Sequence, residues 1–215
     1  MRTHICTLML LVTGVACGQS FPADINKDSL SRFPVVKRSE LDEAGKKAYD
    51  VIAGGAGKTV LSTGPAAIGL YSPQVYERLH TMNDYLRKEG VLGERLTELA
   101  ILVASREVDE QYTWSAHETA ALKAGIAPSV IDAVKYNRDL SGLEEKEAAI
   151  IHFGRQLFQH KKMPTDLFAK TVELFGRRGV VELTVLMGDY HLNVLLLKVA
   201  DQHLHSDRKA LLPPR

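Results

Sequence analysis

Cysteine is nearly absent from this chain of 215 residues: Cys6 and Cys17 are the only two, and both lie within the first twenty residues. If that segment is a leader that is removed, the mature protein keeps no cysteine, or one at its extreme N-terminus. The fold would then hold no disulfide, no CxxC redox pair, no thiolate metal site and no nucleophilic cysteine. Thiol chemistry inside the fold is therefore excluded.

An excess of one charge is also missing. The 27 Lys and Arg residues nearly balance the 26 Asp and Glu residues, and the formal net charge is +1. The basic doublets at 46–47, 161–162 and 177–178 are scattered, whereas binding to nucleic acid needs a clustered basic face. We therefore expect no nucleic-acid partner. With 45% apolar and 25% charged residues, the composition is that of a soluble globular protein.

The first twenty residues differ from the rest of the chain. Arg2 precedes an apolar run at 8–15, and small residues follow in GVACGQS at 14–20. This order is typical of a secretory signal with a small-x-small cleavage site, so we predict a signal peptide at residues 1–18. The apolar run is too short to span a bilayer, which argues against stable membrane insertion. The predicted location is the periplasm or the outside of the cell.

A lipid anchor at Cys17 is the alternative reading of the same segment. Cleavage before Cys17 would leave it as a lipid-carrying N-terminus. Gly14 stands where a leucine is expected in such a signal, so soluble export is favoured.

The remainder divides into an extended arm at 19–38, a helical domain at 39–205 and a tail at 206–215. Apolar residues recur at helical spacing through the domain, and no segment alternates as a strand does. The sequence therefore predicts an all-α fold. The expected helices cover about 39–53, 73–90, 93–107, 110–124, a short segment after 128, 141–160, 165–175 and 178–204.

The helices at 93–107 and 110–124 are joined by about two residues, so they must fold back as an antiparallel hairpin. Glu98 and His117 lie equally far from its turn, which places a carboxylate beside an imidazole. Such a pair is a sensible acid/base device, because the carboxylate fixes the imidazole tautomer. A Glu–His contact between helices is also a common structural hydrogen bond, and a lone Trp such as Trp114 usually belongs to a core.

The run at 94–126 resembles the carboxymuconolactone decarboxylase and alkylhydroperoxidase D-like superfamily. Thiol-dependent members carry a glutamate, a CxxC pair beginning twelve residues later, and a histidine four residues after the second cysteine. These positions fall on Glu98, Glu110, Thr113 and His117, so the glutamate and histidine are kept and both cysteines are missing.

A cysteine-free branch of the superfamily carries a Tyr-x-Trp-x-x-His pattern at this place. Tyr112, Trp114 and His117 match it. That branch commonly has a glutamate where Thr113 stands, so one carboxylate is absent here.

The resemblance implies a compact all-α bundle around the central hairpin, assembled as a homo-oligomer, a trimer or a hexamer, with the site near subunit interfaces. Glu98 and His117 are then the candidate catalytic pair. The candidate substrate-binding residues are Glu110, Tyr112, Thr113, Trp114 and His191 of the last helix.

The thiol peroxidase mechanism of the superfamily requires the two cysteines of the CxxC pair, so it cannot operate in this chain. The decarboxylase branch uses no cofactor and acts on a lactone dicarboxylate, for which it needs a cavity, a cation or hydrogen-bond donor for the carboxylates, and a proton donor. We therefore expect a cofactor-free lyase-type enzyme for a small organic acid or lactone. His117 would donate the proton, and Arg78, Arg95 or Arg106 could hold a carboxylate.

Three alternatives stay open. The chain could be a peroxidase-family member that has lost its thiol mechanism, or a non-catalytic ligand-binding or scaffold protein on the same fold. Two histidines, His117 and His191, with Glu98 would also be a plausible metal set. No HExxH or similar motif supports a metal site, so none is predicted.

Overall fold

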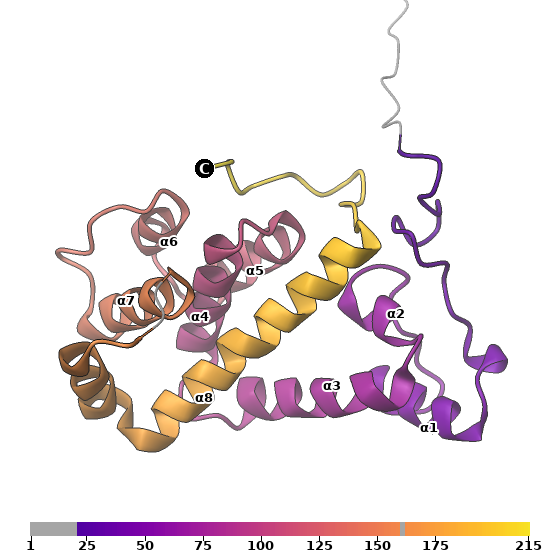
Figure 1. Ribbon diagram of the computed structural model, residues 1–215, viewed down its shortest axis with the longest axis horizontal. Helices are drawn as coiled ribbons and strands as arrows, with labels where there is room; N and C mark the ends of the chain where they lie inside the picture. The colour runs from indigo at the N-terminus through magenta and orange to yellow at the C-terminus, as the bar shows by residue number, and fades with distance from the viewer. Residues whose placement is uncertain (1–20, 160–161) are drawn as a thin grey trace, which may run out of the picture.

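A computed structural model describes residues 21–159 and 162–215 of the chain. Within these ranges every regular element is helical, apart from one isolated antiparallel bridge between Asn26 and Ser31. The all-α prediction is confirmed (Figure 1). The predicted signal peptide lies outside the described residues. In chain order the elements are η1 (Arg38–Glu40), α1 (Glu43–Ile52), α2 (Pro65–Gly69), α3 (Pro73–Lys88), α4 (Gly93–Glu107), α5 (Gln111–Lys123), α6 (Pro128–Lys135), α7 (Glu145–Gln159) and α8 (Thr165–Ala200).

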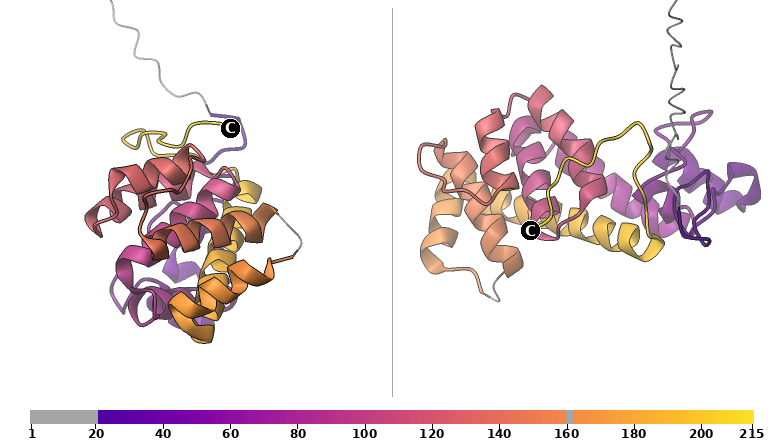
Figure 2. Two further views of the ribbon diagram at one scale, coloured as in Figure 1. Left: turned by 90° about the vertical axis from the view of Figure 1, so that its left-hand side faces the viewer. Right: turned by 90° about the horizontal axis from the view of Figure 1, so that it is seen from above.

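Helix α4 forms the centre of the molecule. Four consecutive residues, 99–102, are fully buried, so this helix is enclosed on all sides. It packs against α5, α7 and α8, and α8 runs diagonally across it in Figure 1. Figure 2 shows the same packing from two further sides.

Helices α4 and α5 form the predicted antiparallel hairpin. Asp109 turns the chain with a left-handed φ of 50°. The next residue, Glu110, is the N-cap of α5, and its carboxylate accepts hydrogen bonds from the backbone N–H groups of Tyr112 and Thr113 at 2.9 and 2.6 Å. This cap satisfies two N–H groups that have no partner within the helix.

Two helices were predicted at 165–175 and 178–204, and α8 does consist of two helical segments that meet at a kink at Gly176. Gly176 has φ 69° and ψ 170°, which no helix accommodates, so the axis changes direction there. The helix ends at Ala200 rather than at residue 204, because Asp201 adopts a left-handed φ of 49°.

Two N-terminal predictions need correction. The helix expected from Ser39 is a 3₁₀ turn followed by α1, because Asp42 rather than Ser39 caps α1 by accepting from the Gly45 N–H at 2.6 Å. No helix was expected between about 53 and 73, but the stretch at 58–73 contains the short helix α2. Pro65 supports that helix because its fixed φ suits the first helical position.

Both ends of the described chain lie against the helices. The N-terminal arm is held to the end of α8 by a 2.7 Å hydrogen bond from the Arg32 N–H to the Ala200 carbonyl. The C-terminal tail runs back over α5, where the Leu212 N–H donates to the Gln111 side chain at 3.1 Å and Leu212 itself is buried.

Candidate functional site

Glu98 and His117 meet across the α4–α5 hairpin. Their Oε2 and Nδ1 atoms are 2.7 Å apart, as the equal distance from the turn predicted. Glu98 is only 2% exposed, and the His117 side chain is mostly buried. Since a carboxylate accepts hydrogen bonds, Nδ1 of His117 is the donor, and a neutral imidazole then carries its lone pair on Nε2.

Arg87 of α3 holds the other oxygen of the same carboxylate. Its Nη2 lies 2.8 Å from Oε1 of Glu98. Glu98 therefore bridges a cation and an imidazole, which compensates the cost of burying its charge.

A cavity of about 260 Å³ opens beside this row of charges. His117 and Arg87 line it, so both partners of the buried Glu98 reach the same space. The ring of His117 also meets the ring of Tyr190 edge-on, with centroids 5.2 Å apart. The complete lining is Pro65, Tyr76, Leu79, His80, Asn83, Asp84, Arg87, Tyr112, Thr113, Ala116, His117, Tyr190 and Asn193.

Polar side chains of α3 and α8 form hydrogen bonds at this lining, with Asp189 behind it. Asn83 donates to Asp189 Oδ2 at 2.8 Å, and Tyr76 donates to Asn193 Oδ1 at 3.3 Å. Burial raises the pKa of Asp189, although the Asn83 hydrogen bond opposes the shift. Burial also raises the pKa of Tyr190 to about 12. The phenol of Tyr190 is therefore neutral at physiological pH and can donate a hydrogen bond but not act as a base.

Glu98 also borders a second, more open hollow of about 510 Å³. Arg87 lines both spaces, as does Asp84. Glu98 thus borders the second hollow, while its partner His117 lines the first cavity.

Of the predicted substrate-binding residues, Tyr112 and Thr113 line the cavity. Tyr112 is fixed by a 3.0 Å hydrogen bond to the hydroxyl of Thr63. This hydrogen bond connects α5 to the segment before α2. Pro65, the first residue of α2, lines the cavity.

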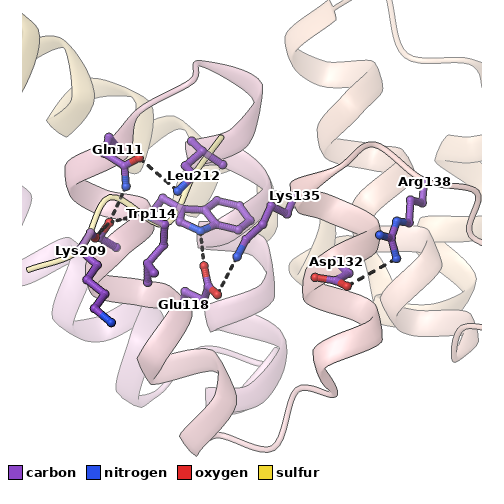
Figure 3. Close-up of polar contacts among 10 residues, drawn as sticks. Gln111, Trp114, Glu118, Asp132, Lys135, Arg138, Lys209 and Leu212 are labelled. Atoms are coloured by element: carbon purple, nitrogen blue, oxygen red, sulfur yellow. Dashed lines mark hydrogen bonds and ion pairs between the residues drawn. The ribbon is translucent and has the colours of Figure 1, made fainter. Parts of the chain in front are cut away.

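Trp114 lies elsewhere. It is fully buried, and its Nε1 donates to Glu118 at 2.5 Å, while Lys135 of α6 pairs with Glu118 at 2.7 Å (Figure 3). The Lys135 ammonium also lies 5.7 Å from the centre of the Trp114 ring. Trp114, a predicted substrate-binding residue, therefore does not line the cavity, because its side chain packs toward α6.

Glu110 and His191 are also not brought to the cavity. The carboxylate of Glu110 is used as the N-cap of α5. His191 stacks against Phe158 of α7, with ring centroids 5.5 Å apart. The proposed grouping of His117, Glu98 and His191 therefore does not form, because successive residues of α8 point to different sides and Tyr190 takes the cavity position.

The three arginines considered as carboxylate holders are engaged elsewhere. Arg95 pairs with Glu144 and Glu147, Arg106 donates to the Pro213 carbonyl, and Arg78 donates to a carbonyl of its own helix. Arg87 is the arginine that reaches the cavity. Nothing in the sequence singled it out, because a basic residue in the last turn of a helix is expected there for the helix dipole alone.

Among the residues that the structure describes, no group of three or more His, Asp or Glu side chains is arranged to hold a metal ion. The cavity lining offers two imidazoles, His80 and His117, and the carboxylate of Asp84. Of these, His117 is already hydrogen-bonded to Glu98, which also pairs with Arg87.

Comparison with known proteins found a family match in the central part of the chain. The model of the carboxymuconolactone decarboxylase family matches residues 73–153, which run from the start of α3 into α7 and include Arg87, Glu98 and His117. Searches of curated proteins and of solved structures gave no match. The match covers residues 73–153 and supports the resemblance of this region to the carboxymuconolactone decarboxylase and alkylhydroperoxidase D-like superfamily.

Proposed function

We propose that this protein is an exported, cofactor-free acid/base enzyme of the lyase type, acting on a small organic acid or lactone in the cavity beside His117. Export is supported by the signal-like pattern of residues 1–18. The chemistry is supported by one observation above all, the row from Arg87 through buried Glu98 to His117 at the cavity wall.

This row gives His117 the means to carry a proton. Its Nδ1 is committed to Glu98, and none of the residues that the structure describes hydrogen-bonds to its Nε2. Nε2 is therefore the nitrogen left for a substrate. In the imidazolium form Nε2 carries the proton that His117 would donate, while Glu98 holds the ring through Nδ1.

Arg87 would hold a substrate carboxylate. Its guanidinium has five N–H donors, and Glu98 accepts from one of its terminal nitrogens, so donors remain for a ligand. Asn83 and Asn193 add neutral hydrogen-bonding groups to the same cavity. A volume of about 260 Å³ suits a small substrate rather than a large cofactor.

In the proposed reaction, the bond between a carboxylate carbon and its neighbour breaks and carbon dioxide leaves. The electron pair stays on the neighbouring carbon, where a conjugated carbonyl or lactone stabilises it as an enolate. The imidazolium of His117 then protonates that carbon. Water restores the proton, so one proton is consumed for each carbon dioxide released.

The test is release of carbon dioxide from a panel of β-keto acids and lactone mono- and dicarboxylates by the purified protein. For an active compound, His117→Ala should lower turnover by roughly 10²–10⁴-fold, the usual contribution of a general acid or base. His152→Ala is the matched control, because His152 is exposed on α7. Turnover that survives His117→Ala would refute the assignment, and binding of a panel compound without any product would indicate a ligand-binding protein instead.

A further inference from the structure

The outer face of α8 carries a row of exposed apolar side chains. Val181, Val185, Leu192, Leu195 and Val199 are 36–67% exposed. Helix α8 lies in front of the bundle in Figure 1 and along its lower edge in the right-hand view of Figure 2, and no described element covers that side. A helix that faces water normally presents polar residues there.

The spacing of the row is that of a seam between two helices. With Gly188 included, the steps from Val181 to Val199 are four, three, four, three and four residues, a heptad pattern. Apolar residues with this period line the contact of paired helices. From Val181 to Leu195 none of the exposed positions is charged, and the one other exposed residue is Thr184.

Gly188 lies in the middle of the row, and neither a close contact nor a positive φ within its own chain requires a glycine there. It is exposed, and a Cβ added to it would meet nothing within 4 Å. Glycine weakens a helix interior, so a glycine at this point is best explained by the close approach of another backbone.

The row is also nearly symmetric about Gly188. Val185 and Leu192 lie three residues before and four residues after it, and Val181 and Leu195 lie seven residues to either side. In an antiparallel pair about a two-fold axis, Val181 of one copy would face Leu195 of the other, without any meeting of like charges. We propose that a second copy of this chain covers this face, with the two α8 helices crossing at Gly188.

A lipid bilayer fits the face less well. Helix α8 is long and apolar enough to cross a membrane by length and composition, but half of the most apolar window is buried against the rest of the chain. Its inward side carries Glu182 and Asp189, both buried within the fold. Only one side of α8 therefore needs a partner.

The pairing is independent of the proposed function, but it bears on the same site. Tyr190 and Asn193, which line the cavity, project from the other side of α8. A two-fold contact also refines the expected homo-oligomer, because it can belong to a hexamer built from three pairs and cannot belong to a simple trimer.

Sedimentation velocity of the full-length protein tests the proposal. We expect an even number of chains, and the double variant Leu192→Glu, Leu195→Glu should run at half the wild-type mass, with pairing weakened by roughly a hundredfold or more. Leu122→Glu is the matched control, because Leu122 is an exposed leucine of α5. A wild type with one chain or an odd number of chains, or a double variant that keeps the wild-type mass, would overturn the proposal. A monomer that binds phosphatidylglycerol vesicles would do so too and would identify the face as a membrane contact.

A cross-link keeps the test decisive if circular dichroism shows that the double variant does not fold. Gly188→Cys is introduced into a chain with Cys6→Ser and Cys17→Ser and is then oxidised. Two copies that cross at residue 188 should form a disulfide-linked dimer, since a disulfide needs Cβ atoms about 4 Å apart. Leu122→Cys in the same background should stay monomeric under denaturing conditions. Absence of the linked dimer for Gly188→Cys would overturn the crossing.

Discussion

Replacing Trp114 by phenylalanine separates a packing role from a role in the site. The change removes the indole N–H that donates to Glu118 at 2.5 Å and part of a fully buried ring. A hydrogen bond to a charged group contributes about 1.5–3 kcal/mol, and the smaller ring leaves a void that adds roughly 1 kcal/mol. Glu118 keeps its partner Lys135 at 2.7 Å, which limits the loss. We expect the free energy of unfolding to fall by about 3 kcal/mol in total.

For a chain of this size, 3 kcal/mol corresponds to a drop in Tm of roughly 6–12 °C. The assay is thermal unfolding followed by far-ultraviolet circular dichroism, because the variant has no tryptophan to report by fluorescence. Tyr136→Phe is the control: its ring is half exposed, so a shift below about 0.5 kcal/mol is expected. Turnover of any compound that the wild type converts should change less than about threefold, because Trp114 does not line the cavity. An unchanged Tm together with lost turnover would refute the reasoning and return Trp114 to the site.

Two further predictions concern α3 and its neighbours. Burial raises the pKa of Asp189, so the folded protein holds this proton to higher pH than the unfolded chain does. The free energy of unfolding of the wild type should therefore fall, relative to that of Asp189→Asn, as the pH rises from the unfolded pKa of Asp through the raised folded pKa. Urea unfolding of both proteins between about pH 3 and 7 would measure this fall. A difference in unfolding free energy that stays constant with pH would contradict the prediction. Gly69→Ala places a methyl group into the ring of Tyr76, which lines the cavity. The substitution should lower the free energy of unfolding by about 2 kcal/mol and disturb the cavity wall. An unchanged urea midpoint of unfolding would show that α2 can move away.

The contact between Glu98 and His117 could be predicted because it depends only on the short segment of chain that forms the α4–α5 hairpin. A two-residue connection forces two helices to be antiparallel, and residues equally far from the turn then face each other. Tyr112 and Thr113 lie on the same helix as His117, so their place beside it in the cavity could be predicted as well. The hairpin and the contact between Glu98 and His117 could thus be predicted from the local sequence alone.

Arg87 and Tyr190 could not be predicted in the same way. They come from α3 and α8, and their place beside His117 depends on how those helices rotate and pack around α4. The side taken by Trp114 was likewise open, since Lys135 of α6 provides its polar surroundings only after the chain has folded. Such long-range packing depends on the fit of many side chains, which helical periodicity does not encode.

By itself, the sequence determined that the fold is all-α, that no cysteine is available in residues 21–215, and that a carboxylate meets an imidazole across a hairpin. Each of these follows from composition or from contacts between near neighbours. The tertiary structure decided which groups share a cavity with His117, which aromatic ring belongs to the core, and that α8 keeps an uncovered apolar face. The physical reason is that burial is a property of the whole packed chain, whereas helix formation and hairpin pairing are properties of short segments.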